Sequence, residues 1–91
     1  MEMADEFLRM SADLRNAMNG SEDNASKTVE KACNRLFEIQ NDAEKTGLAM
    51  ANNVGETMLE LIAKYSSNAV ILRNCISSIT ALTDSNERNR N

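Results

Sequence analysis

The sequence predicts an all-α fold, namely a small antiparallel helical bundle or hairpin with coiled-coil-like packing. Its 91 residues include no proline, the residue that most often ends or kinks a helix. Apolar residues recur at alternating steps of four and three over most of the chain, which is the spacing of one face of an α-helix. Aromatic residues make up only 3% of the chain, and this scarcity indicates slim, closely packed helices without a deep pocket.

A first helix is predicted over residues 3–18. Its apolar stripe consists of Met3, Phe7, Met10, Leu14 and Ala17. The segment 19–24 then holds the densest group of helix-ending and capping residues in the chain. We expect Gly20 to end the first helix in a left-handed conformation. We expect Asp23 or Asn24 to accept the free N–H groups at the start of the next helix.

A second helix is predicted from Ala25 onward. The same rhythm continues through Val29, Ala32, Leu36, Ile39 and Ala43, with Cys33 and Phe37 widening the stripe. The segment 47–56 leaves two alternatives open. Asn52-Asn53-Val54-Gly55 is typical of a turn, and a hairpin folded there gives a three-helix bundle in which Asn53 and Glu56 have capping-box spacing. In the other alternative the heptad frame shifts by four residues within one continuous, very long helix.

The positions of the two cysteines favour the hairpin. Cys33 and Cys75 are nearly equidistant from residue 54, so a hairpin folded there would place them at about the same level. In one continuous helix they would lie about 63 Å apart, at about 1.5 Å per residue. Each cysteine is expected to be a small buried apolar residue. A disulfide between them is compatible only with the hairpin and an oxidising compartment.

A last helix is predicted over residues 57–83. Its heptad seam consists of Met58, Leu61, Tyr65, Asn68, Leu72, Cys75, Ile79 and Leu82, flanked by Ile62, Ala69 and Ile76. Because this helix is apolar on more than one face, we expect it to be buried from two sides. Asn68 on the seam is either a partly exposed residue or a buried polar residue that fixes the helix register. Residues 1–84 are predicted to form one helical domain, and residues 85–91 a flexible polar tail.

Composition and charge exclude several classes of protein. The net charge is −4 and no basic stripe is present, so nucleic acid is not an expected partner. No run approaches the roughly 20 apolar residues of a transmembrane helix. The acidic N-terminus lacks the apolar stretch of a signal peptide. We therefore expect a cytoplasmic protein, or one exported without a cleaved signal peptide.

Residues for catalysis are scarce. The chain has no histidine, which removes the commonest general base and a common metal ligand. Two cysteines that are 42 positions apart cannot form a zinc site alone. Phosphate-binding loops, dinucleotide fingerprints and nucleophile elbows are absent from the sequence. We therefore predict no enzyme activity, no metal and no cofactor.

The remaining prediction is a non-enzymatic protein–protein interaction module. A domain of this size has a marginal core, and such domains often gain stability by oligomerising or by binding a partner. We expect the chain to self-associate or to complete a larger assembly, as a homo-oligomer or a hetero-oligomer. The predicted interface residues are Phe7, Met10, Leu14, Met58, Leu61, Ile62, Tyr65, Leu72, Ile76 and Ile79. The alternative is that all of them form the internal core.

Two resemblances narrow this prediction. The small size, acidic character and helical-hairpin pattern are similar to the small leaderless proteins of type VII secretion and their toxin-targeting partners, without the Trp-x-Gly turn of those proteins. The similarity implies a role as a secretion accessory protein. The last part of the chain contains a second set of residues, most of them at heptad positions, namely Gly47, Met50, Asn53, Val54, Thr57, Met58, Ile71, Ile76, Ile79 and Thr83. In these residues the stretch 47–83 resembles the cytoplasmic coiled coil of bacterial chemoreceptors, which implies a signalling helix.

Overall fold

The computed structural model of the chain is all-helical, as the sequence predicts. It describes the backbone of residues 3–90 and the side chains of residues 5–85. Five helices follow one another, where the sequence predicted three: α1 (Met3–Ala17), α2 (Glu22–Glu38), α3 (Ala43–Ala51), α4 (Val54–Lys64) and α5 (Ala69–Arg90). No strand occurs among residues 3–90. The chain has more helices than predicted because it turns at two places where the apolar spacing of the sequence continues unbroken.

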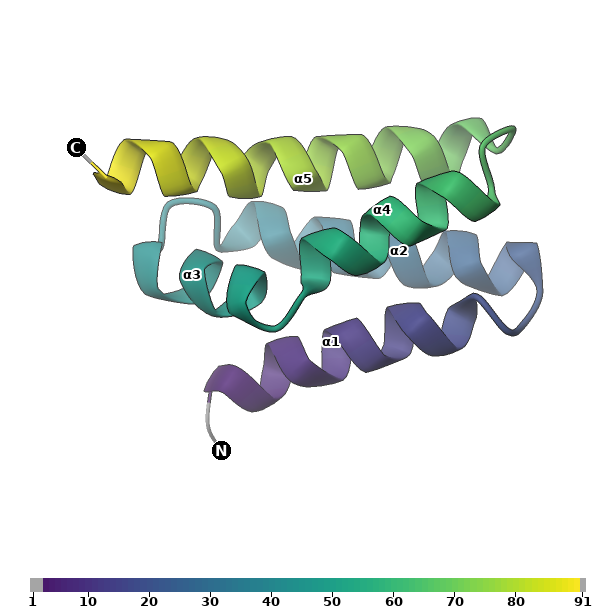
Figure 1. Cartoon of the computed structure of the whole chain (residues 1–91), viewed down its shortest axis with the longest axis horizontal. Helices are drawn as coiled ribbons and strands as arrows, with labels where there is room; N and C mark the ends of the chain where they lie inside the picture. Colours follow the sequence, from purple (N-terminus) through teal and green to yellow (C-terminus); the bar gives the residue numbers. More distant parts are fainter. Residues whose placement is uncertain (1–2, 91) are drawn as a thin grey trace.

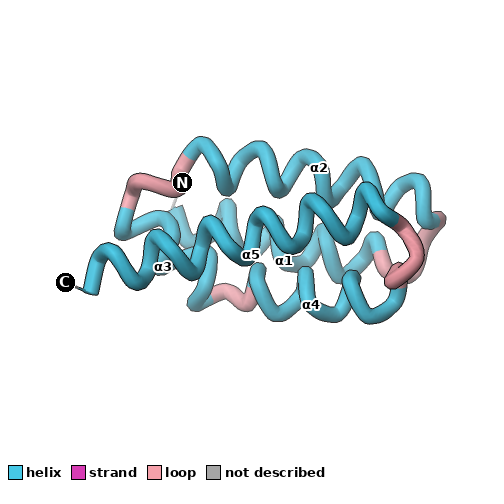
Figure 2. The backbone as a smooth tube through the Cα atoms, turned by 90° about the horizontal axis from the view of Figure 1, so that it is seen from above, coloured by secondary structure: helices cyan, strands magenta, loops and turns pink. Residues whose placement is uncertain are grey.

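Helices α3 and α4 lie end to end with a bend between them, and we call this pair the bent leg. The bent leg, α1, α2 and α5 pack side by side as a bundle (Figure 1). α1 and the bent leg run in one direction, whereas α2 and α5 run in the opposite direction. Helix α5 packs against α2 and the bent leg, and α1 packs against the same two neighbours (Figure 2). The predicted coiled-coil packing is not matched, because the turn between α4 and α5 divides the heptad seam predicted over 58–82.

The first break lies where the sequence predicted it, although its capping residues differ. The Ser21 side chain accepts a hydrogen bond from the Asn24 backbone N–H at 3.1 Å, so Ser21 caps α2 and the prediction of Asp23 or Asn24 is wrong. Gly20 does not have a positive φ, so the predicted left-handed cap is also wrong. Instead the Gly20 N–H donates to the Ala17 carbonyl at 3.2 Å, and α1 ends in a tightened turn.

The second break was missed. Helix α2 ends at Glu38, and Asp42 caps α3 by accepting the Lys45 N–H at 3.1 Å. The sequence pattern gave no sign of this turn because Ile39, which is buried, and Ala43 both keep the helical spacing. Capping by an aspartate therefore overrides an unbroken apolar rhythm here.

The segment 47–56 contains the predicted turn, but the chain bends there without reversing (Figure 1). Asn53 has φ 64°, the left-handed conformation that asparagine tolerates better than most residues. Its side chain makes no cap hydrogen bond, so the predicted capping box with Glu56 is not formed. Asn52 instead donates from its side chain to the Leu48 carbonyl at 2.8 Å. Both the hairpin and the continuous helix are therefore wrong at this point.

The real hairpin lies between α4 and α5, within the stretch predicted as one helix over 57–83. Asn68 is the residue that starts α5, since its side-chain oxygen accepts the Ile71 N–H at 3.0 Å. Asn68 is half-buried, so its interpretation as a partly exposed residue is confirmed and its interpretation as a buried residue that fixes the register is wrong. Helix α5 continues to Arg90, and the Ser85 hydroxyl is buried and donates to the Gln40 carbonyl at 2.6 Å. The flexibility predicted for residues 85–91 stays a prediction, and the side chains of residues 86–91 lie outside the described part.

One apolar core joins all five helices. Its largest fully buried apolar side chains are Phe7, Leu14, Val29, Leu36, Val54, Met58, Leu61 and Ile71. Cys33 of α2 and Cys75 of α5 are free and buried, as predicted for small apolar residues. Burial raises the pKa of the Cys75 thiol to about 11, and the nearby Cys33 adds to this effect. Cys75 therefore acts as an uncharged packing residue at neutral pH, and Cys33 is buried as well.

Candidate functional site

The ten residues predicted to form an interface divide into two groups. The side chains of Phe7, Leu14, Met58 and Leu61 are fully buried and fill the core of the chain itself. The side chains of Met10, Ile62, Tyr65, Leu72 and Ile79 are half-buried, and that of Ile76 is exposed. The second group therefore contains the predicted residues that a partner could still contact.

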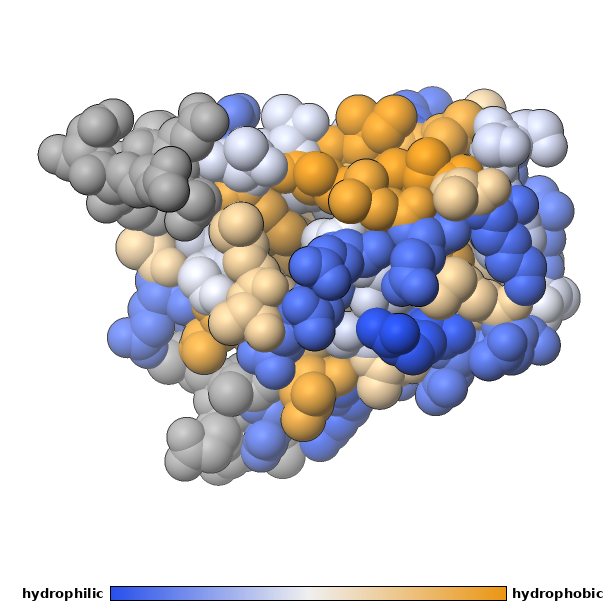
Figure 3. Space-filling view, viewed as in Figure 1, coloured by the Kyte–Doolittle hydropathy of each residue, from blue (hydrophilic) through white to orange (hydrophobic). Residues whose placement is uncertain are grey.

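Four members of this second group lie on two adjacent helices. Together with one residue that the sequence analysis missed, they form what we call the α4–α5 face, defined as Leu59, Ile62, Leu72, Ile76 and Ile79. Leu59 and Ile76 are the most exposed, at 57% and 54% of their surface. Figure 3 shows apolar residues gathered over α4 and α5 on this side of the molecule. Large apolar side chains grouped at the surface are typical of interaction sites.

Helical spacing explains why these side chains gather. Leu59 and Ile62 are three residues apart on α4, while Leu72, Ile76 and Ile79 follow at steps of four and three on α5. The core-facing stripe of α5 is separate and contains Ile71, Cys75, Ser78 and Leu82. Helix α5 is thus apolar on two sides, as predicted, but only one side is covered by the rest of the chain. Leu59 was missed because it lies beside the seam residue Met58 rather than on the heptad pattern.

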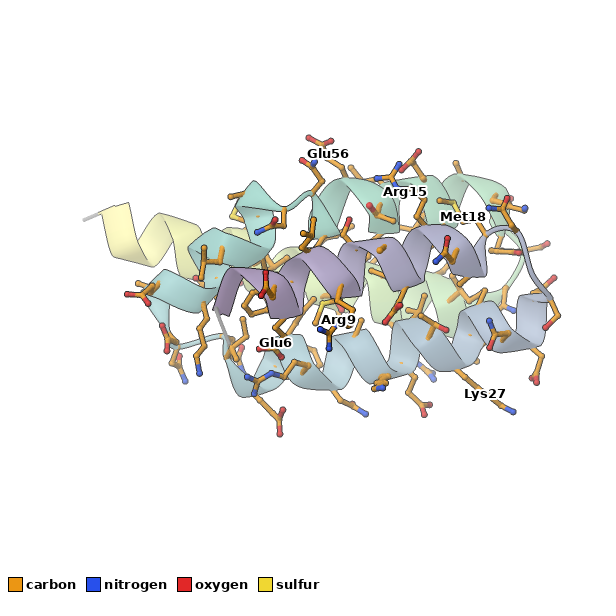
Figure 4. The ribbon with its side chains drawn as sticks, turned by 90° about the horizontal axis from the view of Figure 1, so that it is seen from below. Glu6, Arg9, Arg15, Met18, Lys27 and Glu56 are labelled. Atoms are coloured by element: carbon orange, nitrogen blue, oxygen red, sulfur yellow. The ribbon has the colours of Figure 1, made fainter. Side chains whose placement is uncertain are left out.

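Charged residues border the α4–α5 face. Glu56 and Glu60, one turn apart, are exposed on α4, and Arg73 is exposed on α5. Arg15 of α1 lies 4.0 Å from Glu60, on the side of α4 away from α5 (Figure 4). Arg73 has no ion-pair partner within 4.0 Å among the described side chains. The face is therefore apolar in its centre and charged at its edges, as binding surfaces commonly are.

A groove lies between α1 and α2. This groove of about 700 Å³ has Met10, Leu14 and Ala32 among its lining residues. An ion pair lies across it, since Arg35 donates to both carboxylate oxygens of Glu6, at 2.5 and 3.1 Å. These hydrogen bonds lower the pKa of the Glu6 carboxyl. Glu6 and Arg9 both point from α1 toward α2 (Figure 4). The paired charges have a structural explanation, because they join the two helices.

Buried hydroxyl groups also have structural partners. The Thr57 hydroxyl donates to the Asn53 carbonyl at 2.8 Å and lies 3.3 Å from the Ser11 hydroxyl of α1. Because Thr57 has one hydroxyl hydrogen, Ser11 is the donor in the second contact. Among the described side chains, no group of three His, Cys, Asp or Glu residues is placed to hold a metal ion. None of the described helices has the length and apolar character needed to cross a lipid bilayer.

Comparison of the chain with protein-family models, with curated proteins and with solved structures finds no match. The assignment of a function therefore depends on the α4–α5 face itself.

Proposed function

We propose that this protein is a non-enzymatic helical interaction module that binds partner helices through the α4–α5 face. The exposure of Leu59 and Ile76, each above half of its surface, is the observation that carries the proposal. Exposed aliphatic side chains release free energy when a partner covers them, at about 25 cal/mol for each Å² removed from water. Ile62 and Ile79 pack against the core, which holds this surface in a fixed shape. A preformed surface loses little conformational entropy when it binds.

Site-specific photo-crosslinking tests the proposal. A photoreactive amino acid replaces Ile76 in one variant and Leu8 in another, in cells that naturally produce the chain. Leu8 is a matched control, because it is an apolar residue of α1 with 59% of its surface exposed and lies outside the α4–α5 face. We expect position 76 to crosslink to one defined protein, either a second copy or another chain. Equal or absent products at the two positions would contradict the proposal.

The narrower proposal is a leaderless secretion accessory protein or its toxin-targeting partner. The helical hairpin of α4 and α5 supports it, because such a hairpin offers two adjacent helices to a partner. Its test is the appearance of the full-length chain in the medium of intact cells. A signalling coiled coil of the chemoreceptor kind needs one long helix over 47–83. That stretch is divided among α3, α4 and α5, so the structure supports this role less than an interaction module.

A further inference from the structure

Glu60 and Arg73 lie at opposite edges of the α4–α5 face. Glu60 lies four residues before the end of α4, and Arg73 lies four residues after the start of α5. Since α4 and α5 are antiparallel neighbours joined by a short turn, these two residues lie at about the same level along the bundle. Helical spacing places each of them beyond the apolar stripe of its own helix. The face therefore has Glu60 at one edge and Arg73 at the other, at about one level, and Arg15 lies beside Glu60 on the side away from the face.

We propose that the partner covering the α4–α5 face is a second copy of this chain, related by a two-fold axis parallel to α4 and α5. This inference rests on the function proposed above. Rotation about such an axis places α4 of one copy on α5 of the second, antiparallel to it. Every residue keeps its level, so Glu60 of each copy lies opposite Arg73 of the other. The five apolar side chains of each copy then close together between the four helices.

The charges select this arrangement over the other way of pairing the two faces. A two-fold axis that runs across the helices places α4 on α4, and the acidic edges that contain Glu56 and Glu60 then meet each other. Like charges at an interface oppose association, whereas opposite charges favour it and fix the register. The face consists of five apolar residues on each copy, whereas a stable dimer interface has roughly 20–30 residues on each partner. The dimer is therefore reversible, and dilution separates it.

The test begins with the solution mass of the purified chain, by sedimentation equilibrium from about 10 µM to about 1 mM, the range of weak association. We expect the mass to rise from 10.1 kDa toward twice that value. Ile76→Asp should keep the chain monomeric, while Leu8→Asp on α1 should leave the association unchanged. Circular dichroism checks that both variants stay helical. A wild-type chain that is monomeric throughout would overturn the second-copy inference, whereas the proposed function is decided separately by the crosslinking at position 76.

Variants that reverse the charges of Glu60 and Arg73 then test the direction of the two-fold axis. Glu60→Arg alone and Arg73→Glu alone should each weaken the dimer by about tenfold, because each turns two symmetry-related attractive pairs at the rim into repulsive ones. The double variant has the wild-type net charge and should regain wild-type affinity within about twofold, since each new arginine faces a new glutamate. Glu30→Arg and Lys27→Glu, both exposed on α2, control for the net charge of the single variants. A double variant as weak as the two single effects combined would rule out this axis.

Discussion

Asn68 at the start of α5 donates a hydrogen bond to Glu22 at the start of α2, with 2.6 Å between Nδ2 and Oε2. The Oδ1 atom of the same side chain accepts a hydrogen bond from the Ile71 N–H. The side-chain oxygen of Asn68 therefore caps the start of α5, and its amide nitrogen links α5 to α2, which runs in the same direction. The residue thus fixes where the hairpin of α4 and α5 reverses, and the hairpin in turn forms the α4–α5 face.

We predict that Asn68→Ala lowers the free energy of unfolding by about 1 kcal/mol, the usual effect of losing a helix cap. Urea unfolding followed by circular dichroism measures the change. Asn34→Ala is the matched control, because Asn34 is exposed within α2, where alanine is the better helix former. It should leave the stability unchanged or slightly raised. Equal losses in the two variants would show that Asn68 has no capping role.

The ion pair of Glu6 and Arg35 gives a pH dependence. Because the pKa of Glu6 is lowered from 4.5 in the folded chain, the pair stabilises the fold above about pH 4.5, and this contribution is lost as the pH falls through the lowered pKa. Glu6→Gln should therefore be less stable than wild type at pH 7, and the difference should shrink toward zero in acid. Urea unfolding across this range measures it. The control is Glu30→Gln, at an exposed position of α2 with no ion pair within 4.0 Å among the described side chains, and it should differ little from wild type at any pH. A pH-independent difference for Glu6→Gln would contradict the assignment.

The hydroxyl contact between α1 and α4 should show coupling. Thr57 is fully buried and Ser11 nearly so, so Thr57→Val removes the acceptor of Ser11 and should cost about 1–2 kcal/mol. Ser11→Ala should cost less, because the Thr57 hydroxyl still donates to Asn53. The double variant should be more stable than the sum of the single effects predicts. Strict additivity in a double-mutant cycle would mean that the two hydroxyls do not interact.

The two cysteines should be unreactive in the folded chain. Both are buried, and the pKa of Cys75 is raised to about 11, so the thiolate is scarce at pH 8. We expect iodoacetamide to label the folded protein slowly and the urea-unfolded protein quickly, as mass spectrometry would record. Because the pKa of Cys75 is raised on folding, its contribution to stability should also decline as the pH rises from about 9 toward 11. Rapid labelling of the folded chain would contradict the packing of α2 against α5.

Apolar periodicity was enough to predict the fold class and α1, but not the number of helices. The turns after Ile39 and at Asn68 interrupt the helices without interrupting the rhythm, because the side chains on both sides of each turn still point to one core. Asp42 and Asn68 cap the helices that follow these turns, but aspartate and asparagine also occur inside helices of this chain, as Asp13 and Asn34 do. Tertiary contacts such as that of Asn68 with Glu22 cannot be derived from spacing alone.

The candidate site was predicted in part. Ile62, Leu72, Ile76 and Ile79 follow from the apolar excess of the last two helices, and the structure brings them together. Met58 and Leu61 have the same spacing but are fully buried, because the bent leg turns that stripe toward the core. Periodicity shows which residues share a helix face, whereas only the arrangement of the helices shows which face stays uncovered.

Methyl NMR during dilution tests the central claim most directly. Samples labelled at the isoleucine and leucine methyl groups are compared at several concentrations, and Leu8 on α1 and the buried Ile71 are internal references. We predict concentration-dependent shifts at Leu59, Ile62, Leu72, Ile76 and Ile79, with the references constant. Constant resonances on the α4–α5 face up to about 1 mM, where even weak association is populated, would contradict self-association through this face. Shifts centred on Leu8 would place the interface on α1 instead.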